Sequence, residues 1–276
     1  MQPAISVVVI TKNEEERLAT CLKSIRPHFS DIWVIDSASE DKTADIARGF
    51  GARVVNFKWN GRYPKKYGWC LERLEGVADW VLFIDADERM TEGLAQEIKN
   101  IDLQGYAGFF IKGRYECQGK ILRHGMTNNK LCLLNRHKMK FPHLDDLDIE
   151  GMGEVEGHYQ PVLRAGFKDQ KIGQLKSYLV HATDLLSPSW RDKHERYARW
   201  EAKMDARKLW PQENNMARRI LKKMFKILPC RAGIAFFHSY ILKAGFLDGR
   251  GGYDLAYSRY YYYQIIAHYK RLLKNQ

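Results

Sequence analysis

The chain has few cysteines, and their spacing suits neither a metal site nor a disulfide framework. Only five are spread over 276 residues, and they are Cys21, Cys70, Cys117, Cys132 and Cys230. An odd number of scattered cysteines is typical of a reducing compartment, where buried thiols stay free. The apolar residues Ala4 to Ile10 follow no basic stretch and precede no cleavage site, so we expect no signal peptide and a cytoplasmic protein.

Long hydrophobic runs, internal repeats, low-complexity segments and linkers are also lacking. The most apolar stretch, Arg231 to Leu247, is interrupted by His238 and Lys243. Spanning a bilayer takes about 20 apolar residues, so this stretch is marginal as a transmembrane helix. The sequence therefore favours a globular protein, with only one supported boundary, near residue 185.

An excess of positive charge is confined to the last third of the chain. The net charge is +12, yet residues 1–184 contain 26 Lys and Arg against 26 Asp and Glu, while residues 185–276 contain 19 against 7. Such asymmetry points to nucleic acid or to an anionic membrane surface. We accordingly predict a catalytic domain over residues 1–184 and a helical, basic region over residues 185–276.

The first part contains short apolar strands that alternate with helical segments. The expected strands are Ile5–Ile10, Asp31–Ile35, Arg53–Phe57 and Trp80–Ile84. Asn13 is expected to cap the first helix, which runs to about Ile25. Alternating strands and helices predict a mostly parallel α/β sheet flanked by helices. The first strand is not followed by the G-x-G-x-x-G fingerprint, so a nucleotide would be bound differently.

Two acids follow the most apolar strand, where the chain reads Asp85-Ala86-Asp87-Glu88. Parallel sheets bind ligands beyond the carboxyl ends of their strands. Acids at this spacing repel each other unless a cation lies between them, and oxygen ligands suit Mg²⁺ or Mn²⁺ together with substrate phosphates. A strand end with solvated acids remains the alternative. Asp36 ends the second strand and could accept from a base or ribose group, or could simply form a turn.

Three segments in this order carry a family resemblance. Val8–Glu14, Asp36–Thr43 and Phe83–Glu88 together resemble the family 2 glycosyltransferases of GT-A fold. Asn60–Lys66 and Gly245–Gly252 are similar to segments of the lipopolysaccharide core β-1,4-glucosyltransferase group. The resemblance covers most of the chain and is strongest over residues 4–95.

The resemblance implies a nucleotide-sugar site at the strand ends. Thr11, Asn13 and Asp36 would line the nucleoside. Arg62 and Lys66 would reach the base or the diphosphate, unless they belong to a solvated basic loop.

The resemblance also implies a divalent metal, Mn²⁺ or Mg²⁺, on the donor diphosphate. Asp87 would bind the metal, and Asp85 would contact the ribose or the metal. His181 ends a further apolar strand, Tyr178–His181, and could be a metal ligand, although a structural histidine is equally expected.

Displacement at a sugar C1 requires a general base that removes the acceptor proton. The resemblance implies that this base is an Asp or Glu from the acidic middle of the chain. The segment Glu154-Val155-Glu156-Gly157-His158 offers Glu156 first and Glu154 second. The Asp145/Asp146 pair ranks behind them. Related enzymes often have Val-His-Glu near this point, and the order differs here. Each of these acids could instead be a solvated surface carboxylate.

The basic region reads as amphipathic helices. Ala217–Leu228 places apolar residues on one side and five basic residues largely on the other, namely Arg218, Arg219, Lys222, Lys223 and Lys226. This pattern predicts docking on an anionic membrane, at the inner face of the cytoplasmic membrane. A helical subdomain that packs on the catalytic core is the alternative.

The combined hypothesis is an inverting, metal-dependent hexosyltransferase. It would move a sugar from a nucleotide-sugar, expected to be a UDP-sugar, to a lipid-linked or lipopolysaccharide-core saccharide. A nucleotidyltransferase is the first alternative, but Lys12–Glu16 replaces the Gly-rich phosphate loop of that class. A nucleic-acid-binding protein is the second, but the basic residues alternate with large apolar ones. We therefore expect no nucleic-acid partner.

Overall fold

The computed structural model describes residues 4–157, 159–211, 220, 224–226, 228 and 230–275. Its contacts divide the chain into two units. The first runs to Glu116 and also contains Thr127–Pro142 and Gln160–Thr183. The second contains Cys117–Met126, His143–Tyr159 and the chain from Asp184 onward. The second unit thus combines the C-terminal region with two segments from the middle of the chain, and separate roles for residues 1–184 and 185–276 stay a prediction.

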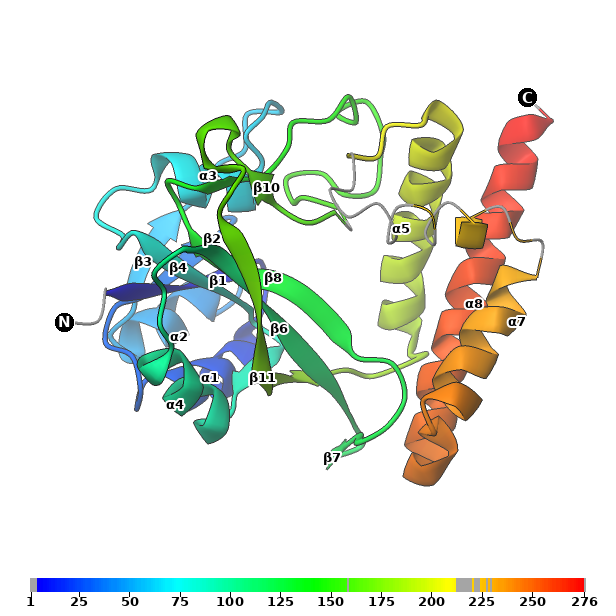
Figure 1. Cartoon of the computed structure of the whole chain (residues 1–276), viewed down its shortest axis with the longest axis horizontal. Coiled ribbons are helices and arrows are strands. Elements are labelled where there is room, and N and C mark those ends of the chain that lie inside the picture. The colour runs from blue at the N-terminus through cyan, green and yellow to red at the C-terminus, as the bar shows by residue number, and fades with distance from the viewer. Residues whose placement is uncertain are drawn as a thin grey trace. The chain divides into compact units, whose positions relative to one another are not determined.

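One large sheet is the centre of the first unit. Its strands lie in the order β3-β2-β1-β4-β8-β6-β11-β5 (Figure 1). They are β1 (Ile5–Thr11), β2 (Ile32–Asp36), β3 (Arg53–Asn56), β4 (Trp80–Asp85), β5 (Glu88–Met90), β6 (Tyr106–Cys117), β8 (Asn128–Asn135) and β11 (Lys171–Ala182). Strands β1 to β4 are parallel, whereas β8 is antiparallel to both β4 and β6. The predicted α/β fold is confirmed, with antiparallel strands added beyond β4.

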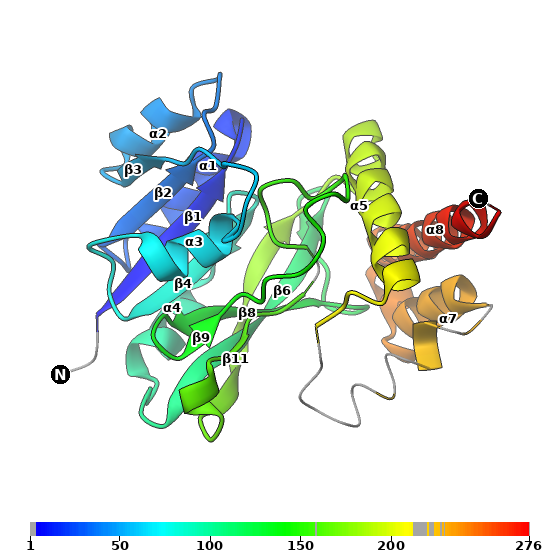
Figure 2. The ribbon, with the colours of Figure 1, turned by 90° about the horizontal axis from the view of Figure 1, so that it is seen from above.

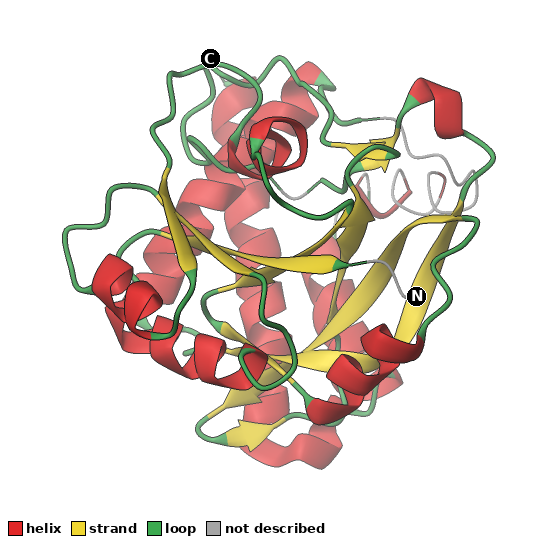
Figure 3. Ribbon diagram, turned by 90° about the vertical axis from the view of Figure 1, so that its left-hand side faces the viewer, coloured by secondary structure: helices red, strands yellow, loops and turns green. Residues whose placement is uncertain are grey.

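Helices cover both faces of this sheet. They are α1 (Glu15–Ile25), α2 (Thr43–Gly49), α3 (Lys66–Arg73) and α4 (Glu92–Asn100). The short helix η1 (Ala165–Phe167) and a separate two-stranded sheet of β9 (Met139–Lys140) and β10 (Val162–Leu163) complete the set of elements. In Figure 1, α3 lies above the sheet and the other three lie below it, and Figure 3 shows the strands between helical layers. Val7, Val8 and Val9 are fully buried because helices cover both faces of β1. Each such side chain contributes about 1.5–3 kcal/mol.

The predicted cap of α1 is wrong. Asn13 lies in the left-handed region, with φ 54°, and its side chain does not cap the helix. The first helical N–H groups instead reach the loop after β2, because that loop packs against the start of α1. The N–H of Glu14 donates to Thr43 Oγ1 at 2.7 Å, and that of Glu15 donates to Asp41 Oδ2 at 3.1 Å.

The second unit is mainly helical. It contains β7 (Lys120–Ile121), α5 (Pro188–Arg207), α7 (Arg231–Phe237), a π-helix η2 (His238–Leu242), η3 (Gly245–Asp248) and α8 (Gly249–Lys274). The long helix α8 packs against α5 and α7, as Figures 1 and 2 show. Helix α5 begins at Pro188, and the Ser187 side chain before it accepts a hydrogen bond from the Trp190 N–H.

Most of the predicted basic helix lies outside the described residues, including Arg218, Arg219, Lys222 and Lys223. Lys226 is described, and it is paired within the unit. Its Nζ lies 2.6 Å from Asp205 Oδ1 and 3.8 Å from the centre of the Trp210 ring. Its charge is therefore used inside the unit, because Asp205 needs a counter-ion there.

The apolar stretch Arg231–Leu247 is not one helix, since it is divided among α7, η2 and η3. Ala244, in the left-handed region with φ 55°, reverses the chain before η3. In the part of the chain that the structure describes, no helix has the length and apolar character needed to cross a membrane.

Candidate active site

Two loops at the carboxyl ends of β1 and β2 are bonded to each other. The parallel register places Thr11 beside Asp36, and the Thr11 hydroxyl donates to Asp36 Oδ1 at 2.9 Å. Asp36 also accepts from the N–H of Ser39 at 2.9 Å. Asn13 Oδ1 accepts from the N–H of Glu40 at 2.9 Å. The structure thus brings together Thr11, Asn13 and Asp36, the three residues predicted to line the nucleoside.

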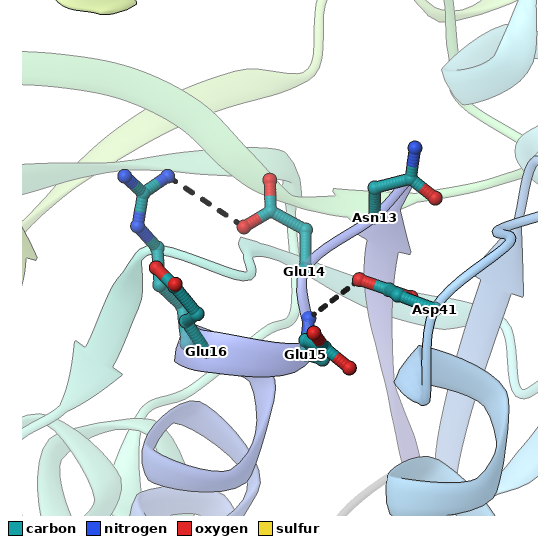
Figure 4. Close-up of a pocket in the computed structure, with 6 residues that line it drawn as sticks. Asn13, Glu14, Glu15, Glu16 and Asp41 are labelled. Atoms are coloured by element: carbon teal, nitrogen blue, oxygen red, sulfur yellow. Dashed lines mark hydrogen bonds and ion pairs between the residues drawn. The ribbon is translucent and has the colours of Figure 1, made fainter.

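A hollow beside this junction is strongly acidic. Figure 4 shows its lining residues, which are Asn13, Glu14, Glu15, Glu16, Arg17 and Asp41. Arg17 is the only cation among them, and its guanidinium lies 3.6 Å from Glu14. Four carboxylates repel a diphosphate. The hollow is therefore unsuited to the phosphates of a nucleotide.

The two predicted basic residues differ in their surroundings. Lys66 is fully buried at the start of α3, where its Nζ donates to the Thr11 carbonyl at 2.8 Å and to Ser37 Oγ at 2.5 Å. Lys66 therefore links the two loops through its ammonium group. Arg62 is exposed in the preceding loop, where its N–H donates to Asn60 Oδ1. The structure thus brings Lys66, but not Arg62, into contact with the strand-end loops.

An ionic cluster forms at the ends of β4 and β11. Lys130 Nζ lies 2.7 Å from Asp85 Oδ2 and 2.7 Å from Glu88 Oε1. His181 Nδ1 lies 3.5 Å from Asp87 Oδ1 and 3.6 Å from Glu88 Oε1. The antiparallel β11–β5 pair places His181 opposite Glu88. Strand pairing therefore assembles three carboxylates and two basic groups at one edge of the sheet.

The charges in this cluster stabilise each other. Burial acts to raise the pKa of Asp85, but Lys130 and a hydrogen bond from the Tyr67 hydroxyl (2.6 Å) outweigh it, so this pKa lies well below its usual range. Burial acts to lower the pKa of Lys130, yet Asp85 and Glu88 raise it well above the usual value. For His181, burial likewise lowers the pKa, and Asp87 and Glu88 raise it further than burial lowers it.

The donor atoms near His181 fit a divalent cation. Asp87 Oδ1 and His181 Nδ1 are both buried and face each other. No complete ligand set of three or more His, Cys, Asp or Glu is found among the described residues. Mg²⁺ commonly takes only one or two protein ligands and completes its shell with phosphate oxygens and water. Asp87 and His181 suit that pattern, whereas both oxygens of Asp85 already bind Tyr67 and Lys130.

Sequence reasoning missed Lys130 and Tyr67. The only signal for Lys130 is its place at the start of an apolar strand. A lysine buried there would need an acidic partner, because buried lysines are rare unless paired. Its partner became visible only with the β4–β8 pairing, in which Trp80 lies opposite Asn135 and the strands run antiparallel.

We expect Lys130→Met to destabilise the protein by about 3 kcal/mol, because breaking a buried ion pair leaves uncompensated carboxylates. The lower end of the usual range applies, since the Lys130 side chain keeps 22% exposure. Urea unfolding at pH 7 measures the effect, and Lys112→Met on the exposed side of β6 is the matched control.

The destabilisation caused by Lys130→Met should be smaller in acid. Asp85 has a lowered pKa in the folded state, so its contribution is present above its usual pKa of 3.8 and is lost as the pH falls below it. Equal midpoints for the Lys130 and Lys112 variants at pH 7 would contradict the role of the ion pair.

The candidate bases belong to the second unit. Glu156 is buried, with 7% exposure, and Glu154 is partly buried. Asp145 is exposed, whereas Asp146 is buried and accepts from Trp200 Nε1 at 3.3 Å. The last residue of the predicted segment, His158, lies outside the described residues. The structure therefore does not bring these acids into one unit with the ionic cluster.

The fully buried Trp200 of α5 fixes the acidic segment in place. A Cβ at Gly157 would lie 2.2 Å from the Trp200 ring, so only glycine fits there. Gly151 has φ 126°, and a Cβ there would meet the Arg196 carbonyl at 2.7 Å. Glu156 therefore directly precedes a residue that is packed against an aromatic anchor.

Comparison with known proteins identifies a family for the chain. The model of Glycosyl transferase family 2 matches residues 6–169. An uncharacterized glycosyltransferase of Rickettsia typhi is 39% identical over 97 residues, which are 35% of this chain and 32% of that protein. The 4,4'-diaponeurosporenoate glycosyltransferase of Staphylococcus haemolyticus is 34% identical over 129 residues, which are 44% of this chain and 34% of that protein. The chain spans about a third of the length of these curated relatives.

One solved structure aligns with nearly the whole chain. The mannosyltransferase PcManGT from Pyrobaculum calidifontis, in complex with GDP-Man and Mn²⁺, covers 99% of this chain and 88% of its own. The TM-score is 0.54 and the identity is 13%, so the likeness shows a shared GT-A fold.

Proposed function

Because the chain belongs to glycosyl transferase family 2, we propose that it transfers a sugar from a nucleotide-sugar donor to a saccharide acceptor with inversion at the sugar C1. A UDP-sugar is the first candidate donor. The observation that carries the proposal is the cluster at the ends of β4 and β11, where Asp87 and His181 present buried donor atoms 3.5 Å apart.

The donor would be bound from two sides. Thr11, Asn13 and Asp36 would contact the nucleoside, as their junction at the ends of β1 and β2 supports. Asp87 and His181 would bind Mn²⁺ or Mg²⁺, which supplies positive charge to the departing nucleoside diphosphate. Asp85 would accept from the ribose in the orientation that Lys130 and Tyr67 give it. The Mn²⁺ in the PcManGT complex is a reason to test this metal first.

Glu156 would remove the proton from the attacking acceptor hydroxyl. Its burial supports this role, because a base shielded from water loses less of its strength to competing solvation. Glu154 is the second candidate. Asp146 is the weakest, since one of its oxygens already accepts from the Trp200 indole.

We propose a lipid-linked or lipopolysaccharide-core saccharide as the acceptor, and a peripheral location on the inner face of the cytoplasmic membrane. The support is the confinement of the net positive charge to residues 185–276. The alternation of these charges with large apolar side chains favours a lipid surface over nucleic acid.

A hydrolysis screen tests the donor proposal. UDP-, GDP- and dTDP-sugars are each incubated with the protein and Mn²⁺ or Mg²⁺, without acceptor. We expect slow release of free sugar and nucleoside diphosphate in equal amounts for one donor. Release of pyrophosphate from a nucleoside triphosphate, with no turnover of any nucleotide-sugar, would instead favour the nucleotidyltransferase alternative.

A further inference from the structure

The second unit exposes large apolar side chains along one short stretch of chain. Five residues within positions 237–247 form what we name the apolar ridge. They are Phe237, Ile241, Leu242, Phe246 and Leu247, with exposures of 51, 44, 66, 48 and 61%. Single exposed apolar residues are ordinary on protein surfaces, but a concentration of this kind marks an interaction surface.

The apolar ridge stands on a packed base. The rings of Tyr240 and Phe246 have centroids 6.3 Å apart, and Tyr240 also contacts Phe236 at 5.4 Å and Tyr253 at 5.9 Å. These contacts join η2 and η3 to the first turns of α8. Phe236 and Tyr240, which are half-buried, therefore support the ridge from within the unit.

The backbone around the ridge is also fixed. The Lys243 carbonyl accepts from the N–H of Gly125 at 2.8 Å, and Asp248 Oδ2 accepts from the N–H of His124 at 2.6 Å. A Cβ at Gly252 would lie 1.8 Å from the Gly245 carbonyl oxygen, so η3 and α8 approach as closely as glycine allows. The ridge is therefore preformed, and its exposure does not result from a loosely packed segment.

The charges around the apolar ridge indicate which kind of partner binds it. Lys243 lies exposed within the ridge, and the Arg250 side chain just after it is 78% exposed. The adjacent acid, Asp248, accepts the His124 N–H, and Asp254 is bonded to Arg250. A second copy of this chain would bring like charges together, since residues 185–276 contain 19 Lys and Arg against 7 Asp and Glu. Anionic lipid headgroups match both the cations and the apolar side chains.

We propose that the apolar ridge inserts into the interface of an anionic lipid bilayer, with Lys243 and Arg250 at the level of the headgroups. Docking by this ridge does not depend on the five basic residues of the Ala217–Leu228 segment. The inference rests on the proposed function in one respect, namely that docking would give the enzyme access to a lipid-linked acceptor.

Co-sedimentation with vesicles tests this proposal on the whole chain, without any sugar donor. The vesicles contain phosphatidylcholine alone or with about one-third phosphatidylglycerol. The double variant Leu242→Gln/Leu247→Gln should bind the anionic vesicles about tenfold or more weakly than the wild type, because two exposed leucines no longer enter the bilayer. The control is Leu147→Gln/Leu272→Gln, which alters two other exposed leucines of the same unit, with exposures of 43% and 45%.

Circular dichroism and thermal melting verify that both double variants fold. Equal binding of the ridge variant and the wild type would overturn the proposal. The proposal would also be overturned if the wild type formed a dimer, the ridge variant were a monomer and neither bound vesicles. The ridge would then contact a second copy of the chain rather than lipid. Since no donor is present, vesicle binding is independent of the transfer reaction, and either proposal can fail without the other.

Discussion

Asp87→Asn should reduce sugar transfer by more than about 100-fold while the fold stays intact. An amide cannot supply the negative charge that binds a divalent ion beside the diphosphate. The Asp87 side chain is only 16% exposed and its Oδ1 lies 3.5 Å from His181 Nδ1, the other proposed ligand. Transfer by the wild type should likewise stop in EDTA and return with Mn²⁺ or Mg²⁺.

Two measurements separate loss of metal from loss of structure. Calorimetric titration of Mn²⁺ in the presence of nucleoside diphosphate should show binding to the wild type and little to Asp87→Asn. The control is Asp45→Asn, a change in an 81% exposed carboxylate of α2 that should alter neither binding nor activity. Full wild-type activity in chelator would show that the metal assignment is wrong.

The candidate donor site could be read from the sequence where it depends on local patterns. A continuous run of apolar residues predicts a strand such as Trp80–Ile84, and the acids that follow must lie at its carboxyl end. The neighbouring order of β1, β2 and β4 follows from βαβ connections. For these reasons Thr11, Asp36, Asp85 and Asp87 were all expected at one edge of the sheet, where the structure places them.

The parts that depend on distant pairing could not be read in this way. Lys130 contacts Asp85 across 45 positions of sequence, through an antiparallel strand that no local pattern assigns to β4. The N–H groups at the start of α1 donate to Asp41 in the loop after β2 and to Thr43 at the start of α2, so the local rule that favours Asn13 fails. Lys226 shows the same limitation, because its helical periodicity suggests a solvated face and only the fold reveals Asp205 beside it.

Exposure in the second unit is equally hard to predict. The stretch Arg231–Leu247 has the composition of a buried or membrane-spanning helix. The structure divides it at η2 and Ala244, and this division leaves Leu242 and Leu247 outside the packed interior. A pattern of apolar residues predicts that a surface must be covered, but it does not specify whether protein or lipid covers it.

Glu156→Gln should lower turnover by about 100-fold or more, the usual contribution of a general base. Glutamine preserves the size of the side chain but cannot take the acceptor proton. Donor binding should change little, because no proton moves when the donor binds.

Two neighbouring variants assign the role. Glu150→Gln, at an exposed position, should behave as the wild type. Asp146→Asn should lower the melting temperature more than the turnover, because Asp146 is buried and accepts a hydrogen bond from Trp200. If Glu156→Gln is active while Glu154→Gln is not, the base is Glu154. The Trp200 anchor at Gly157 would then position the segment for the residue two places earlier, and burial of Glu156 would serve packing rather than catalysis.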